Sequence, residues 1–195
     1  MKLLYQPASP FVAKVHMAAA HLGIELEAVP SDATKEAPEL LELNPLGKIP
    51  CLVTDDDEAI YDSRVIMREL DRRARGALYP ADDPLRTERY EALCDGIADA
   101  AVAFQYEKRF RPEEKWERTW LDRQWGKVTR GLRVAAEETP PLDRLHAGSF
   151  ALAATLAYLD LRYPAEWQAN VGALLDWQTR FDERHPDLAA LKPSA

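Results

Sequence analysis

The chain has little of what marks several large classes of protein. Its 195 residues include two cysteines, Cys51 and Cys94, which lie far apart and form no CxxC pair. This usage argues against a disulfide framework and favours a reducing cytoplasmic compartment. No apolar run approaches the roughly 20 residues that span a bilayer, and the N-terminus meets Pro7 too early for a signal peptide. We therefore expect a soluble cytoplasmic protein with no membrane contact.

Charge and ligand spacing argue against two further classes. The formal net charge is −8, whereas a protein that binds a nucleic-acid backbone needs a concentrated basic face. Five arginines cluster between residues 64 and 75, but Glu69 and Asp71 lie among them, so we expect a solvated helix face. The four histidines lack metal-ligand spacing, and there is no glycine-rich phosphate loop. The sequence thus predicts no nucleic-acid partner and no metal.

The pattern of apolar residues changes partway along the chain. Residues 2–5 and 25–29 read as strands, residues 51–53 and 59–61 as a hairpin, and residues 38–43 as a short helix. A first helix is expected from Pro10, with Ser9 as its N-cap and Gly23 at its end, and another from Ser63 to about Arg73. This order resembles a thioredoxin-like fold with a right-handed crossover.

Everything after a segment rich in proline and aspartate has helical spacing. We expect an α/β thioredoxin-like N-terminal domain over residues 1–76, a linker over 77–84 and an all-α helical C-terminal domain over 85–195.

The stretch from Asn44 to Ser63 is the most informative in the chain. Pro50 stands just ahead of an apolar strand, which favours a fixed turn and a cis peptide bond and leaves the backbone of Ile49 free to pair with an extended ligand. Ser63, at a helix start, offers a hydroxyl and unpaired N–H groups to an anion. The pattern predicts a site for a small peptide-like acid in an extended pose.

These motifs, in this order, resemble the glutathione transferase family. The resemblance rests on Asn44–Pro50 with its hairpin and Asp62–Ser63, on Ser9-Pro10-Phe11 after the first strand, and on Leu78-Tyr79-Pro80 with Asp83-Pro84 and Arg86. It covers essentially the whole chain. It implies a homodimer that uses reduced glutathione as co-substrate and conjugates it to small hydrophobic electrophiles.

The resemblance assigns Ser9 to the glutathione sulfur. A free thiol with a pKa near about 8.5 is mostly protonated at pH 7, so the site must favour the thiolate. A hydrogen bond to a charged group contributes roughly 1.5–3 kcal/mol and a helix N-terminus about 0.3–2. Together these could lower the thiol pKa by roughly 1.5–3.5. Helix capping alone would also explain Ser9, and Tyr5 is a rival activator. Cys51, in an apolar strand, reads as a buried small hydrophobe.

The resemblance also implies the remaining contacts. Ile49, with its geometry fixed by Pro50, would pair with the cysteinyl unit, and Asp62 and Ser63 would hold the γ-glutamyl end. Lys35 and Lys48 would meet the glycyl carboxylate, although either could simply be solvated. Four aromatic residues are candidates for the acceptor pocket, with core packing as their alternative: Phe11, Phe104, Tyr106 and Trp116.

One departure from the family pattern concerns a late helix. Members usually begin it with Ser or Thr followed three residues later by Asp, whereas this chain has Ser149 followed by Leu152. We therefore expect no capping box there. Two other functions stay open: a non-catalytic module that binds a protein partner with the same fold, and a glutathione-dependent thiol–disulfide reductase, against which the serine at position 9 counts.

Overall fold

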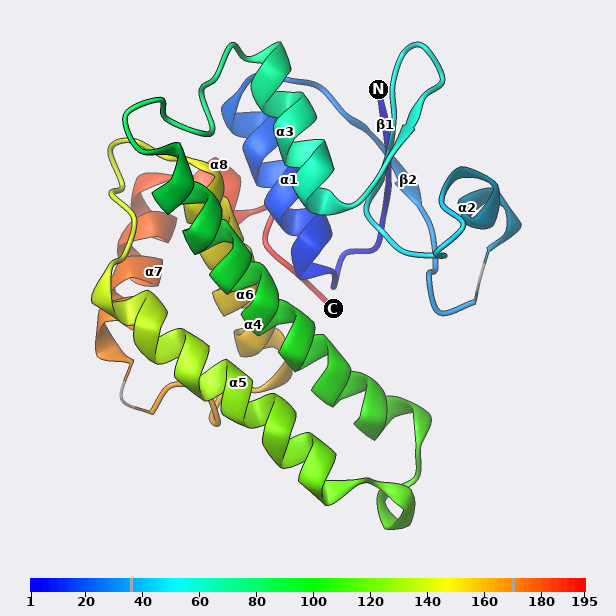
Figure 1. Cartoon of the computed structure of the whole chain (residues 1–195), viewed down its shortest axis with the longest axis vertical. Coiled ribbons are helices and arrows are strands. Elements are labelled where there is room, and N and C mark those ends of the chain that lie inside the picture. The colour runs from blue at the N-terminus through cyan, green and yellow to red at the C-terminus, as the bar shows by residue number, and fades with distance from the viewer. Residues whose placement is uncertain (36, 170) are drawn as a thin grey trace.

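A small mixed sheet lies at the N-terminal end of the molecule (Figure 1). The computed structural model describes residues 1–35, 37–169 and 171–195. The sheet has the strand order β2-β1-β3-β4. Strand β1 pairs in parallel with β2 and antiparallel with β3, which in turn pairs antiparallel with β4. The strands are β1 (Lys2–Tyr5), β2 (Glu27–Pro30), β3 (Cys51–Val53) and β4 (Ala59–Ile60). The second strand begins and ends slightly later than the sequence predicted.

Three helices belong to this part of the chain, and each begins at a recognisable signal. Pro10 is the first residue of α1 (Pro10–His21), because proline has no N–H to leave unpaired in a first turn. Pro38 begins α2 (Pro38–Leu43) in the same way. Asp62 caps α3 (Ser63–Arg73) by accepting a hydrogen bond from the backbone of Arg64. These bounds confirm the thioredoxin-like prediction.

The rest of the chain is predominantly helical, as predicted. The long helices α4 and α5 lie side by side, and α6 packs between α4 and α1 (Figure 1). The elements are α4 (Pro84–Phe110), the 3₁₀ turn η1 (Glu113–Lys115), α5 (Arg118–Glu137), α6 (Ala147–Arg162), α7 (Gly172–Arg184) and α8 (Pro186–Ala189). None of the helices in the described ranges is both long and apolar enough to cross a membrane.

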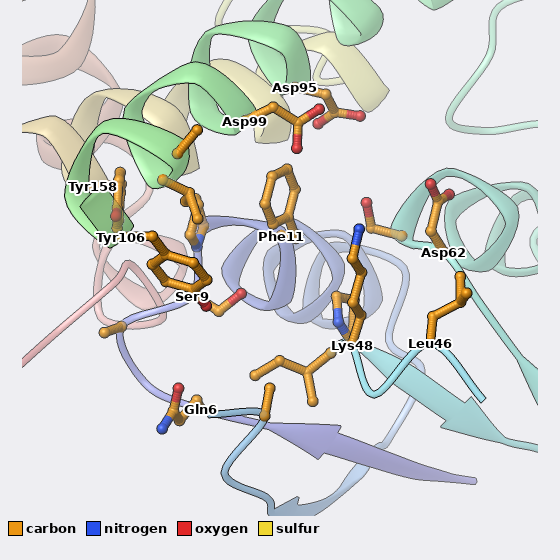
Figure 2. Close-up of a pocket in the computed structure, with 18 of the residues that line it drawn as sticks. Gln6, Ser9, Phe11, Leu46, Lys48, Asp62, Asp95, Asp99, Tyr106 and Tyr158 are labelled. Atoms are coloured by element: carbon orange, nitrogen blue, oxygen red, sulfur yellow. The ribbon is translucent and has the colours of Figure 1, made fainter. Parts of the chain in front are cut away.

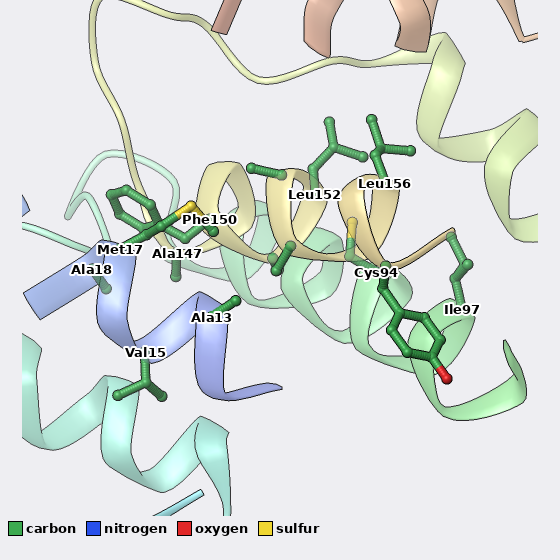
Figure 3. Close-up of a cluster of buried hydrophobic side chains, with 14 of the residues drawn as sticks. Ala13, Val15, Met17, Ala18, Cys94, Ile97, Ala147, Phe150, Leu152 and Leu156 are labelled. Carbon is green, nitrogen blue, oxygen red and sulfur yellow. The ribbon is translucent and has the colours of Figure 1, made fainter. Parts of the chain in front are cut away.

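One main hydrophobic core contains side chains from both the N-terminal part of the chain and the helical part that follows it. Figure 3 shows side chains of α1, α4 and α6 packed into one cluster. Ala13 and Met17 of α1 are almost completely buried, as are Phe150 and Leu152 of α6. Small residues along α1 and α6 let the two backbones approach closely. Helix α1 is therefore packed between α6 on one side and α3 on the other.

A buried ion cluster adds a polar connection at the same seam. The Lys14 ammonium on α1 lies 3.0 Å from Glu91 Oε1 and 2.8 Å from Asp95 Oδ2, and its side chain is 1% exposed. Arg64 Nε on α3 donates to Asp95 Oδ2 at 3.0 Å, and the Tyr79 hydroxyl donates to Glu91 Oε2 at 2.7 Å. Two cations therefore balance two carboxylates. Breaking such a pair would leave an uncompensated buried charge.

The prediction about the late helix was wrong. Helix α6 begins at Ala147, so His146 is the N-cap and Ser149 is the third helical residue. The Ser149 hydroxyl accepts a hydrogen bond from the His146 backbone, while the His146 ring accepts one from the Gly148 backbone. A reciprocal cap is therefore present, but its N-cap is residue 146, three residues before the serine that the sequence suggested.

Replacing Lys14 with methionine should destabilise the protein strongly. The change leaves Glu91 and Asp95 buried with one cation fewer, so we expect the free energy of unfolding to fall by roughly 3–5 kcal/mol. Urea denaturation followed by circular dichroism measures it. Arg72→Ala is the matched control, because the exposed pair with Glu69 should contribute no more than about 1 kcal/mol. Equal losses in both variants would contradict the expectation.

Candidate functional site

A cavity of about 930 Å³ lies between the N-terminal part and helices α4 and α6. Figure 2 shows Ser9, the N-cap of α1, and Phe11 of α1 near the middle of the cavity, with Tyr106 and Tyr158 on one side. Asp62, Asp95, Asp99 and Lys48 lie on the other side. A cavity lined by both parts of a protein is a usual place for a small-molecule site.

Ser9 combines the two roles that the sequence left open. Its hydroxyl accepts a hydrogen bond from the Val12 backbone at 3.3 Å, so Ser9 caps α1. The same half-buried side chain lines the cavity at the helix N-terminus. A hydroxyl has a hydrogen left to donate while it accepts. Ser9 can therefore cap the helix and donate to an anion in the cavity at the same time.

The loop before β3 presents a backbone edge to the cavity. Buried Asn44 holds this loop: its amide donates to the Lys48 carbonyl at 2.7 Å, and its side-chain oxygen accepts from the Leu46 backbone at 3.1 Å. The Ile49–Pro50 peptide bond is cis, as predicted. Within the described part of the chain, the backbone of Ile49 makes no hydrogen bond. Its polar groups are available to an extended ligand.

The start of α3 supplies the next part of the cavity wall. The Asp62 carboxylate caps the helix at the Arg64 backbone and remains exposed. Ser63 is only 4% exposed, and its hydroxyl has no hydrogen-bond partner among the described residues. The helix N-terminus and this hydroxyl together suit a carboxylate, while Asp62 suits a cation.

Six titratable residues of α3, α4 and α6 line the cavity without having been predicted from the sequence: Arg64, Asp95, Asp99, Arg109, Tyr158 and Arg162. The only available signal was spacing, since 95 and 99, and likewise 158 and 162, lie one helical turn apart. Arg64 was expected on a solvated face, and its side chain is 49% exposed, but it also pairs with Asp95. Loss of water and the Asp95 carboxylate raise the pKa of Asp99.

Several predicted residues lie outside the cavity. Lys35 is exposed and pairs with Asp32 at 3.3 Å. Tyr5 packs its ring against His16, with 5.7 Å between the ring centroids. Phe104 packs against Trp125 and Tyr163, and the Trp116 ring donates to the Arg111 carbonyl. Ser9, Phe11, Lys48, Ile49, Pro50, Asp62, Ser63 and Tyr106 are brought together.

Neither cysteine lines the cavity. Cys51 and Cys94 are both buried and unpaired with each other, as expected for small apolar core residues. Burial raises the pKa of Cys51 to about 11 and that of Cys94 well above its usual value. Among the described residues there is no group of three or more His, Cys, Asp or Glu side chains arranged to hold a metal ion.

Comparison with known proteins accounts for this arrangement. The sequence model of the glutathione S-transferase N-terminal domain matches residues 8–73. The uncharacterised GST-like protein YibF of Escherichia coli is 32% identical over 169 residues, 83% of each chain. The chain belongs to the glutathione transferase family.

Solved structures of family members agree over the full length. A glutathione transferase family member from Pseudomonas fluorescens with bound glutathione is 35% identical, with a TM-score of 0.88 over 100% of this chain and 99% of that one. Another structure from that species holds S-(propanoic acid)-glutathione. A glutathione S-transferase from Methylobacterium radiotolerans in complex with glutathione sulfonate is 32% identical, with a TM-score of 0.90 over 100% and 95%.

The two thiols should be inert in the folded protein. At pH 8 a thiol with a pKa of about 11 is roughly one part in a thousand thiolate, and both sulfurs are buried. We expect no colour with 5,5′-dithiobis(2-nitrobenzoate) at pH 8 over minutes, and two equivalents of released thiolate in 6 M urea as the positive control. Rapid release from the folded protein would show that a cysteine is accessible.

Proposed function

We propose that the protein is an enzyme that conjugates reduced glutathione to small hydrophobic electrophiles, with the thiolate stabilised by Ser9. The observation that carries the proposal is the convergence of three features on one cavity. They are the Ser9 hydroxyl at the start of α1, the backbone of Ile49, which makes no hydrogen bond to another described residue, and the start of α3. These features match, in order along the cavity, the sulfur, the cysteinyl backbone and the γ-glutamyl end of the tripeptide.

The proposed binding mode follows from the charges of the ligand. The γ-glutamyl carboxylate lies against the Ser63 hydroxyl and the N-terminus of α3, where the helix dipole favours an anion. Its ammonium lies beside Asp62. Lys48, which projects into the cavity, is the proposed partner of the glycyl carboxylate; Lys35 stays a weaker prediction because it lies outside.

The proposed chemical role of the protein is to stabilise the thiolate of glutathione and to hold it in one position. Ser9 donates a hydrogen bond to the sulfur anion, and the N-terminus of α1 adds a favourable dipole end. Phe11, half-buried in the same wall, offers apolar surface to the electrophile. The thiolate displaces a leaving group or adds to a polarised double bond, and a C–S bond forms.

Two further parts of the proposal come from the family. We also propose the homodimer that the resemblance implies; sedimentation would measure its mass in solution. The relative with bound S-(propanoic acid)-glutathione supports room for a substituent beside the sulfur, since that ligand carries a carbon chain there.

Removing the Ser9 hydroxyl should weaken catalysis. We expect kcat/KM with 1-chloro-2,4-dinitrobenzene to fall roughly 10- to 100-fold in Ser9→Ala, because a hydrogen bond to a charged sulfur contributes about 1.5–3 kcal/mol. Thiolate absorbance of bound glutathione at 240 nm, titrated with pH, should move to higher pH by the matching amount.

Two variants separate this role from capping and from the rival tyrosine. Glycine is a tolerable N-cap, so Ser9→Gly should lose as much activity as Ser9→Ala while keeping more stability. Tyr5→Phe removes the other hydroxyl and should retain activity. If Ser9→Ala keeps full turnover, Ser9 is only a cap and the assignment fails.

Asp62→Asn should weaken glutathione binding without disturbing α3. Asparagine caps helices as well as aspartate, so the variant loses chiefly the charge that faces the ammonium. We expect the Kd for reduced glutathione to rise about tenfold in titration calorimetry, as the loss of one charged hydrogen bond implies. Asp56→Asn, in the exposed turn before β4, is the control. Unchanged affinity in Asp62→Asn would remove Asp62 from the site.

A further inference from the structure

The two sides of the cavity differ in charge, and the difference bears on the electrophile. The side beside α3 holds Asp62, Asp95 and Asp99, with Tyr106 and Tyr158 on the other side of Ser9 (Figure 2). Arg109 of α4 and Arg162 of α6 also line the cavity. Tyr158 lines the same cavity. Burial raises the pKa of Tyr158 to about 12, and the Arg162 and Arg109 guanidinium groups act against that rise.

Among the described residues, these two arginines have no carboxylate partner. Neither Arg109 nor Arg162 takes part in an ion pair within the part of the chain that the structure describes. The Nε atom of Arg162 is buried and has no hydrogen-bond partner among those residues. A buried donor without an acceptor is costly. A planar guanidinium beside a tyrosine hydroxyl is well suited to a carboxylate, which accepts from both.

We propose that the electrophile carries a carboxylate, which Arg162, Arg109 and the Tyr158 hydroxyl bind while the glutathione sulfur attacks from beside Ser9. The inference rests on the proposed function and names its substrate class: short α,β-unsaturated carboxylic acids. The opposite side of the cavity is occupied by the ends of glutathione in the proposed binding mode, and its arginine, Arg64, already pairs with Asp95.

The chemistry also explains what the arginines contribute. The thiolate sulfur adds to the β-carbon, a C–S bond forms, and the π electrons move onto the α-carbon and the carboxylate. A proton from solvent then completes the thioether, so no group leaves and no oxidant is needed. In water the carboxylate charge opposes this step, since the transition state gains a second negative charge. Fixed guanidinium and hydroxyl donors stabilise that charge.

The test compares acrylate with acrylamide, its neutral isostere. For each we measure the acceleration of glutathione addition over the uncatalysed rate, and then the ratio of the two accelerations. We expect the ratio to fall about tenfold in Arg109→Gln and in Arg162→Gln, as the loss of one charged hydrogen bond implies. Arg123→Gln, an exposed arginine of α5 outside the cavity, should leave the ratio unchanged.

A binding measurement separates this inference from the proposed function. In titration calorimetry, S-(2-carboxyethyl)glutathione should bind more tightly than S-propylglutathione. The preference should vanish in Arg109→Gln, and because the Arg109 side chain is exposed we expect this variant to fold. Equal binding of the two thioethers, or an unchanged ratio in both variants, overturns the inference. In that case, turnover of acrylamide and 1-chloro-2,4-dinitrobenzene would still support the proposed transferase activity. If no electrophile is turned over, the proposed function itself is contradicted.

Discussion

One buried ammonium group fixes the geometry on which the rest of the molecule depends. Lys14 is fully enclosed between Glu91 and Asp95, so α1 and α4 have one favourable register relative to each other. A buried charge tolerates little displacement, because each ångström of separation from its partner costs energy in a medium of low dielectric constant. The start of α1 with Ser9, and the face of α4 that lines the cavity, are thereby held against each other.

The same cluster shapes the electrostatics of the cavity. Arg64 reaches Asp95 from α3, so the helix start that carries Asp62 and Ser63 is tied to α4 as well. The carboxylates of this side then face the position proposed for the ammonium of glutathione. Near Tyr158, on the other side of Ser9, Arg109 and Arg162 have no ion-pair partner among the described residues. The cavity thus has most of its carboxylates on one side of Ser9, and Tyr158 with its two neighbouring arginines on the other.

Local signals predicted the elements of the N-terminal part closely. Proline at positions 10 and 38 and aspartate at position 62 mark helix starts that the structure confirms, because these residues act through their own backbone and their nearest neighbours. Where a helix could begin at more than one residue, the local sequence did not show which residue would be its N-cap. Helix α6 is capped by His146, which lies three residues before Ser149 and is uncommon in this role.

The sequence alone pointed to Ser9, Ile49, Pro50, Asp62 and Ser63, each through a short local motif, and all five line the cavity. Only the tertiary structure decided the opposite wall. It placed Asp95, Asp99, Arg109, Tyr158 and Arg162 across the cavity, kept Lys35 out of it, and turned Phe104 into the core. The physical reason is that helical spacing shows which residues share a face, whereas helix–helix packing decides whether that face meets core, solvent or cavity.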